Sequence, residues 1–167
     1  VVIMNEVLIA NIITLIGSIF MVAASYSKIN KRSVIYQSIQ IFAFIISNII
    51  LGGITGIIIN SLSLLRNLLT SIGKLNNIFK YGILLLIVIL TIIFNNLGFI
   101  GYLPLIGTVI FTIFIDSKDR FKFRLSLTFS IFMWLIYDFY IMSYTSAIFD
   151  LVSVIGGIIF VINSKVK

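Results

Sequence analysis

A chain of 167 residues that is 60% hydrophobic and only 10% charged cannot cover a soluble globule, because soluble domains carry about a quarter charged residues. The chain contains no cysteine and no histidine, which excludes disulfides, thiolate and histidine catalysis, and nearly all zinc or haem ligation. We therefore expect neither an enzyme nor a cofactor. The net charge of +7 comes from basic residues in short clusters between apolar runs, and this pattern does not indicate a nucleic-acid partner.

The apolar runs predict an all-α, polytopic membrane protein with about seven transmembrane helices. A span needs about 20 apolar residues, or about 17 where the bilayer is thin. In chain order the runs are 7–25, 34–51, 54–72, 80–99, 103–115, 125–142 and 144–163. The fifth run is too short unless Phe99 to Tyr102 contribute, and Pro104 suits the first turn of that helix.

Basic residues occupy alternate connections between the predicted helices. They cluster between runs one and two, three and four, and five and six, and at the end of the chain, whereas the connections around Gly52 to Ile54, Gly101 and Ser143 carry none. Because cytoplasmic loops are enriched in Lys and Arg, this pattern predicts an outer N-terminus and a cytoplasmic C-terminus. We expect Arg66 to reach the cytoplasmic headgroups and the basic clusters to contact anionic membrane lipids.

The first and last parts of the chain align without a gap when 90 is added to the residue number. The run Leu15 to Ser18 then falls on the run Leu105 to Thr108. Polar residues also coincide, and polar residues inside lipid-spanning segments are too costly to recur by drift. The coinciding polar pairs are Asn48 with Asp138, Thr55 with Thr145, Asn60 with Asp150, and Ser63 with Ser153.

This internal repeat predicts one membrane domain, 1–167, built on a 3+1+3 plan. Three-helix units at 1–72 and 101–167 keep the same orientation only if one extra helix separates them, and we expect that linker helix within 73–100. Between Gly82 and Phe94 the only polar side chain is Thr91, so this helix should face lipid. Parallel three-helix repeats around an axis along the membrane normal are a transporter plan, with the binding site at the repeat interface.

Several short motifs carry a resemblance to known families. They are the run Leu103–Thr108 with the sequence Leu-Pro-Leu-Ile-Gly-Thr, the aromatic segment Trp134–Tyr140, the acidic Asp150, and the pair Arg66 and Asn67. On these motifs the chain is similar, over nearly its whole length, to the YgjV-like family of bacterial inner membrane proteins. Its helix plan resembles that of the SWEET, semiSWEET and PQ-loop carriers, although their Pro-Gln pair is missing here. The resemblance implies a multi-pass protein of the bacterial cytoplasmic (inner) membrane.

Polar residues on the predicted helices form a candidate solute site. Asn60 and Asp150 each lie about 9 Å below the outer end of their helix at 1.5 Å per residue. We expect them to approach each other between helices three and seven, with Asn48 and Asp138 above them toward the outside. An isolated carboxylate in the membrane is costly, so Asp150 should be protonated or hydrogen-bonded. The predicted substrate-binding set is Asn48, Asn60, Ser63, Trp134, Tyr137, Asp138, Asp150 and Ser153.

Each of these assignments has a structural alternative. Asn60 and Asp150 could form a hydrogen bond between helices, and Asp138 could be a solvated interfacial group. Small residues such as Ser63 often serve close helix packing, and Trp134 suits an aromatic belt at the membrane surface.

We predict a transporter or facilitator for a small polar solute. The alternative is a non-transporting membrane protein that binds a partner protein or a lipid through its helix faces. A polar cavity between the repeats would favour transport, whereas tightly packed repeats with an exposed small-residue face would favour the partner. The expected partners are membrane lipids and an unidentified solute, and no metal is expected. The sequence leaves open whether the protein forms a homo-oligomer.

Overall fold

The computed structural model describes residues 4–51, 54–95, 97–140 and 143–165. Within these ranges the chain forms seven helices and no strand. Gly52, Gly53 and Lys167, which the charge pattern places in an outer connection and at the cytoplasmic end, lie outside the described residues. The helices are α1 Met4–Tyr26, α2 Asn30–Leu51, α3 Ile54–Ser71, α4 Asn77–Phe94, α5 Gly98–Phe114, α6 Arg120–Tyr140 and α7 Tyr144–Lys165.

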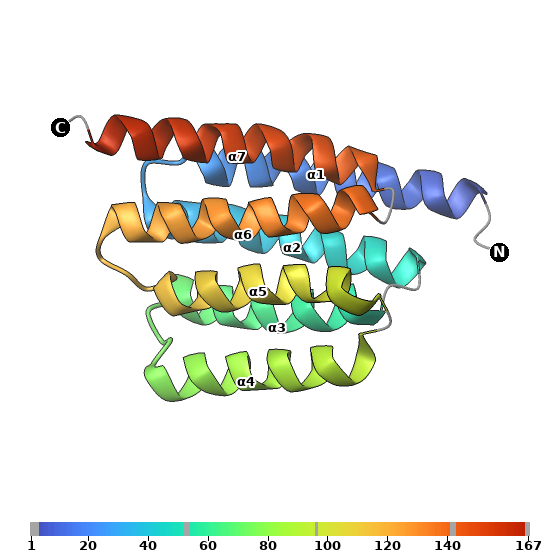
Figure 1. The fold of residues 1–167 in the computed structure, drawn as a ribbon, viewed down its shortest axis with the longest axis horizontal. Helices are drawn as coiled ribbons and strands as arrows, with labels where there is room; N and C mark the ends of the chain where they lie inside the picture. The colour runs from blue at the N-terminus through green and yellow to red at the C-terminus, as the bar shows by residue number, and fades with distance from the viewer. Residues whose placement is uncertain (1–3, 52–53, 96, 141–142, 166–167) are drawn as a thin grey trace.

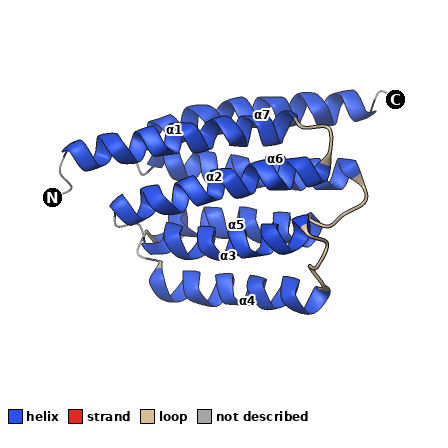
Figure 2. Ribbon diagram, turned by 180° about the vertical axis from the view of Figure 1, so that it is seen from behind, coloured by secondary structure: helices blue, strands red, loops and turns tan. Residues whose placement is uncertain are grey.

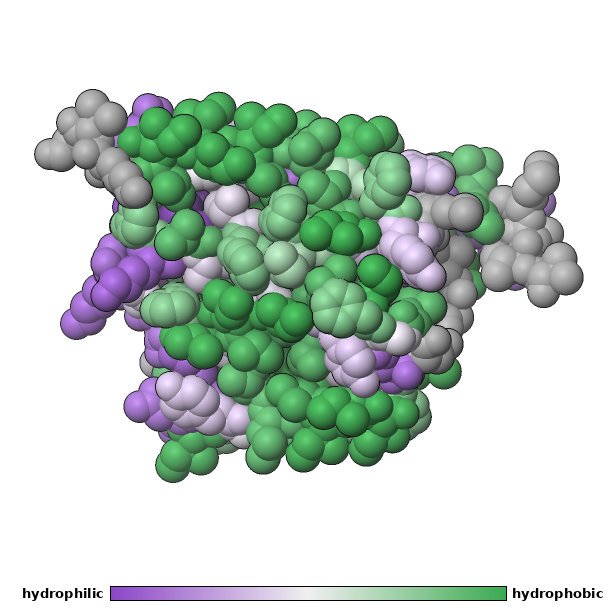
Figure 3. All heavy atoms as spheres, in the orientation of Figure 1, coloured by the Kyte–Doolittle hydropathy of each residue, from purple (hydrophilic) through white to green (hydrophobic). Residues whose placement is uncertain are grey.

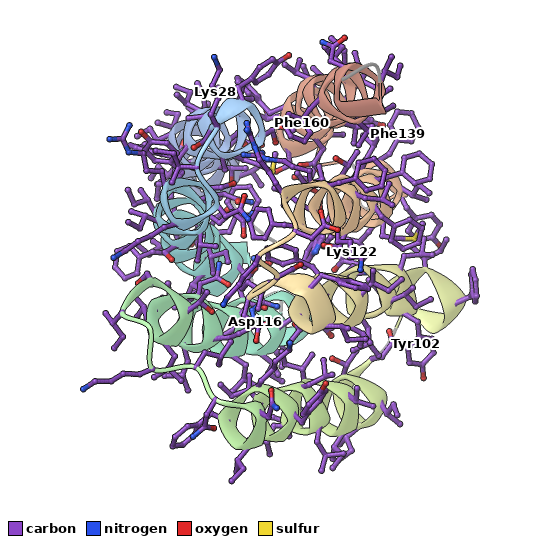
Figure 4. All side chains as sticks on the ribbon, turned by 90° about the vertical axis from the view of Figure 1, so that its left-hand side faces the viewer. Lys28, Tyr102, Asp116, Lys122, Phe139 and Phe160 are labelled. Carbon is purple, nitrogen blue, oxygen red and sulfur yellow. The ribbon has the colours of Figure 1, made fainter. Side chains whose placement is uncertain are left out.

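The helices form two rows that face each other. One row contains α1, α2 and α3 in that order, and the other contains α7, α6 and α5 (Figure 1). The rows meet where α1 packs on α7 and, more narrowly, where α3 meets α5. The fourth helix lies outside both rows and packs on α3 and α5, as the view along the bundle shows (Figure 4).

One end of the bundle carries the basic connections. The connections from α1 to α2, from α3 to α4 and from α5 to α6 lie at this end together with the end of α7 (Figure 2). They contain Lys28, Lys74 and Lys118, and we name this end the basic end. Hydrophilic residues gather there, whereas the sides of the bundle are largely apolar (Figure 3).

The apolar exterior fits a protein surrounded by lipid. Four helices are long and apolar enough to cross a membrane, at Asn5–Tyr26, Asn30–Ile50, Asn77–Phe94 and Tyr144–Asn163, and Gly98–Phe114 is a shorter apolar helix. Large hydrophobic side chains on all seven described helices are exposed. Because lipid rather than water can cover such a surface, the chain is an all-α polytopic membrane protein.

The helix bounds differ from the predicted ones mainly where polar residues begin a helix. The helices α2, α4 and α6 start at Asn30, Asn77 and Arg120, three to five residues before the apolar runs, because a helix continues past the hydrocarbon core. Asn76 caps α4, since its side chain accepts a hydrogen bond of 2.8 Å from the backbone N–H of Phe79. Such caps satisfy amide groups that the first turn leaves free.

The break between α4 and α5 corrects three expectations. The fourth helix ends at Phe94 instead of residue 99, where Asn95 takes an extended conformation and its side chain bonds to the Leu97 N–H and the Gly98 carbonyl. Gly98 has a φ of 56°, which favours glycine. Gly101, expected in the connection, lies inside α5, and Pro104 also lies inside the helix instead of in its first turn.

At the basic end, two buried cations donate hydrogen bonds to carbonyl groups near the C-termini of neighbouring helices. Arg124 of α6 donates from Nη1 to the carbonyls of Ala24 and Ser25, at 2.9 and 2.7 Å, near the C-terminus of α1. Lys80 of α4 donates from Nζ to the Ile113 carbonyl at 2.6 Å near the C-terminus of α5. Cations are favourable at these sites because the last carbonyls of a helix are unsatisfied and carry partial negative charge.

Candidate functional site

A cavity of about 60 Å³ lies between the two helix rows. Six helices line it, and α4 does not contribute. Space for one water needs roughly 10 to 15 Å³, so the cavity has room for a few waters or for a solute with few atoms. The polar lining residues are Gln37, Gln40, Asn60, Ser63, Arg66, Thr108, Ser130, Trp134, Asp138 and Asp150.

Two carboxyl groups meet at one level of the cavity. Asp138 of α6 and Asp150 of α7 are 5% and 1% exposed. A side-chain hydrogen bond joins them, and Asp138 also bonds to Ser146 of α7. A hydrogen bond between two carboxyl groups needs a proton on one of them, because a carboxylate is an acceptor only. At least one proton is therefore shared by these two acidic groups at the α6–α7 interface.

Arg66 of α3 supplies the opposite charge. It is 2% exposed, and its Nε and Nη2 atoms donate to the Asn67 side-chain oxygen at 3.0 and 2.8 Å. Its Nη1 donates to the hydroxyl of Thr112 on α5, and the guanidinium lies 5.1 Å from the centre of the Phe111 ring. Within the part of the chain that the structure describes, Arg66 forms no ion pair.

Three buried polar groups in this cavity lack a partner. They are the amide nitrogens of Gln37 and Asn60 and the Oδ2 atom of Asp150. The oxygen of the Gln37 side chain accepts from Asn67 at 3.4 Å, which links it to the Arg66 group. Buried polar atoms are normally paired with protein or with ordered water, so these three atoms are available to whatever occupies the cavity.

An apolar layer lies between the cavity and a wider recess at the basic end. The recess has a volume of about 310 Å³ and is lined by polar residues that include Lys31, Thr70 and Asp116. Val34 and Ile115 line the recess, and Phe111 lines the cavity. All three belong to one buried apolar cluster with Phe123, whose ring meets that of Phe111 edge to face at 5.6 Å.

The structure brings five of the eight predicted site residues together. Asn60, Ser63, Trp134, Asp138 and Asp150 all line the cavity. Asn60 and Asp150 face it from opposite rows, although α7 packs on α1 and α6 whereas α3 packs on α2, α4 and α5. The two residues that we expected to approach each other between helices three and seven thus line one cavity between the rows.

The other three predicted residues do not line the cavity. Asn48 donates to the Phe44 carbonyl at 2.8 Å and contacts Gly56 of α3, so it serves helix packing. Tyr137 is buried beneath Trp134, with the ring centres 5.7 Å apart. Ser153 is fully buried on α7 away from the cavity lining.

Arg66 is the residue that sequence reasoning misplaced. It does not reach the headgroups, because its side chain is buried and bonded to Asn67 and Thr112. The sequence contained one sign of a site role for Arg66. It directly precedes the polar Asn67 on the helix that also carries Asn60 and Ser63. Gln37 also lines the cavity, and its sequence position gave no reason to prefer it over the other polar residues of α2.

One of three comparisons with known proteins gave a match, and it agrees with a membrane protein. Neither the comparison with curated proteins nor that with solved structures gave a match. The family model Imp-YgjV, described as a bacterial inner membrane protein, matches residues 8–164. This match spans all but the two ends of the chain and every residue that lines the cavity. The chain therefore belongs to the Imp-YgjV family of bacterial inner membrane proteins.

Proposed function

We propose that this chain is a carrier or facilitator for a small polar solute, which binds in the central cavity. The observation behind the proposal is the group of unpartnered buried atoms on Gln37, Asn60 and Asp150, which line one cavity from three helices. A polar solute can accept from the two amides and donate to the carboxyl group. Buried polar groups are costly in a membrane unless matched, and a solute would match them.

The position of the cavity supports transport over the alternative of partner binding. It lies between the two helix rows, and an apolar layer that includes Val34, Phe111 and Ile115 separates it from the recess at the basic end. A carrier needs a central site that is closed toward at least one side at a time. A protein that only bound a partner through its outer faces would have no need of polar groups in such a cavity.

The two rows also support the two-repeat plan that such a carrier would use. Adding 90 to the residue number carries α1, α2 and α3 onto α5, α6 and α7. The contact of α1 with α7 then corresponds to that of α5 with α3, and both contacts are present. We propose that 1–72 and 101–167 are the repeats, that α4 joins them, and that the basic end faces the cytoplasm.

Uptake into proteoliposomes tests the proposal. The purified chain in liposomes is exposed to a mixture of glycerol, simple sugars and amino acids, and solutes in the lumen are measured by mass spectrometry against protein-free liposomes. We expect faster entry of at least one polar solute. Asp150→Asn should keep the fold and change the rate, whereas Asp150→Leu should abolish the entry because it removes the polar group and adds apolar volume.

Ile148→Leu provides the matched control, because Ile148 lies on the same helix and is 62% exposed. This variant should leave the rate unchanged. Monodisperse elution from a sizing column shows that each variant is folded. Entry at the protein-free rate for every solute, with a folded wild type, would overturn the proposal and favour partner or lipid binding.

A further inference from the structure

The cavity holds opposite charges at two levels along the membrane normal. Arg66 follows Asn60 by six residues on α3, a separation of about 9 Å toward the basic end at 1.5 Å per residue. Asp150 is six residues from the start of α7, and Asn60 is six residues from the start of α3. The helix positions therefore place Asp150 near the level of Asn60 and place Arg66 closer to the basic end.

Among the described residues, neither Arg66 nor the acid pair forms an ion pair. The guanidinium of Arg66 bonds to the uncharged Asn67 and Thr112, and the described ion pairs are those of Lys80 with Asp116 and Lys122 with Asp119. Asp138 and Asp150 line the same cavity and take part in neither of these ion pairs. The cavity thus carries a cationic group at one level and a pair of acidic groups at the other.

Two of the three unpartnered atoms, those of Gln37 and Asp150, follow the same polarity. Toward the basic end, the free amide of Gln37 lies with the Arg66 and Asn67 group, and both Gln37 and Arg66 offer hydrogen-bond donors. At the other level, the free Oδ2 atom of Asp150 can accept a hydrogen bond, and the free amide nitrogen of Asn60 adds a donor. A ligand that satisfies both levels has an anionic acceptor at one end and a cationic donor at the other.

We propose that the solute is a small zwitterion, with a carboxylate directed toward Arg66 and an amine directed toward Asp138 and Asp150. This inference rests on the proposed transport function and names the substrate class of the same site. A compact cavity of about 60 Å³ favours a solute with few non-hydrogen atoms. A desolvated charge in the membrane needs an opposite charge, and a zwitterion supplies one to each group of the site.

Binding of matched probes to the full chain in lipid nanodiscs tests the substrate class. The probes are glycine and 4-aminobutyrate as zwitterions, butyrate as an anion, butylamine as a cation and 1-butanol as a neutral molecule. Calorimetry should show that one zwitterion binds at least about tenfold more tightly than each single-charge or neutral probe, the effect expected for losing one charge-assisted contact.

Two variants should separate the two ends of the ligand. Arg66→Gln should remove the advantage of the zwitterion over butylamine, whereas Asp150→Asn should remove its advantage over butyrate. A purely structural role for either residue would weaken all probes alike. If Arg66→Gln fails to fold, Arg66→Lys replaces it as the test variant. Because it keeps the positive charge, it should retain part of the preference for the zwitterion over butylamine. Lys122→Gln is the charge control, because Lys122 is exposed and is not one of the residues that line the cavity.

The outcomes distinguish this inference from the proposed function. If 1-butanol, butyrate or butylamine binds as tightly as the zwitterions, and Asp150→Leu abolishes that binding, the zwitterion is wrong and the polar-solute site stands. If no probe binds and no solute enters liposomes, both proposals fail.

Discussion

At the scale of single residues, buried cations take two different roles in this protein. Lys80 is 4% exposed, and its Nζ atom bonds to the Ile113 carbonyl and to Asp116 at 2.7 Å. It therefore fixes the outer helix α4 to the C-terminus of α5. Arg66 is equally buried, but its bonds go to neutral side chains beside a cavity. A buried charge with structural partners on a helix end is stabilising, whereas one beside a cavity can meet a ligand.

Replacing Lys80 should loosen α4. Lys80→Met keeps the chain length of the side chain but removes two charge-assisted hydrogen bonds, and we expect a loss of about 1 to 3 kcal/mol in the free energy of unfolding. The measurement is the fraction of monodisperse protein after heating in detergent. Lys122→Met is the control, because its contact with Asp119 is 4.0 Å long and both side chains are largely exposed; such pairs contribute little. Equal losses in the two variants would contradict the role of Lys80.

The residues of the site were only partly predictable from the sequence. The repeat identified Asn60 and Asp150, because polar residues at equivalent membrane depths stand out in an apolar chain. It could not separate Asp138, which lines the cavity, from its counterpart Asn48, which packs on Gly56. Which face a polar residue presents depends on helix rotation, and one residue of rotation is about 100°.

At the scale of helices, glycines allow close packing of neighbouring helices within each row. A Cβ atom at Gly17 of α1 would lie 3.0 Å from the Ala43 Cβ of α2. A Cβ atom at Gly107 of α5 would lie 3.0 Å from the Ser130 Cα and 3.1 Å from the Met133 Cβ of α6. These glycines are 90 residues apart, as are Ala43 and Met133. Equivalent positions thus make equivalent contacts. This structural agreement supports the proposed repeat independently of sequence identity.

A larger side chain at Gly107 should separate α5 from α6. Gly107→Leu would meet backbone atoms of Ser130, which cannot move aside as a flexible side chain can, and overpacking costs about 1 to 3 kcal/mol or more. We expect a lower yield of folded protein and a lower midpoint of thermal aggregation. Gly82→Leu is the matched control, because a Cβ atom at Gly82 of α4 meets nothing within 4 Å. If both variants behaved like the wild type, close packing at Gly107 would be ruled out.

The number and order of the helices could be predicted because every apolar run except the fifth is long enough to require a helix in lipid, and the fifth becomes long enough when Phe99 to Tyr102 are added. The beginnings of α2 and α6 could not, since Asn30 and Arg120 are polar and helical residues outside the hydrocarbon core resemble loop residues in composition. The break at Asn95 was also missed, because the apolar residues Leu97 and Phe99 continue the hydrophobic run across a turn that Gly98 makes.

At the scale of the whole molecule, the arrangement of charge is asymmetric along the bundle. The described connections at the basic end contain Lys28, Lys74 and Lys118, whereas Ser143 lies at the opposite end, at the start of α7. The buried cations Lys80 and Arg124 also bond to helix ends on the basic side. Since Lys and Arg are retained in the cytoplasm during insertion, several parts of the molecule support the proposed orientation, which does not rest on any one loop.

Labelling of single cysteines should show this orientation. The chain has no cysteine of its own, so Lys118→Cys and Ser143→Cys each introduce one reactive thiol at opposite ends of the bundle. In intact spheroplasts a membrane-impermeant maleimide should label Ser143→Cys at once and should label Lys118→Cys only after the membrane is opened. The opened membrane serves as the control for accessibility of both thiols. Labelling of both sites from the outside would contradict the seven-span path, and the reverse pattern would show that the basic end is external. The second result would reverse the proposed orientation of the protein in the membrane. It would leave the proposed site unchanged, because Asn60, Arg66 and Asp150 line the cavity whichever end of the bundle faces the cytoplasm.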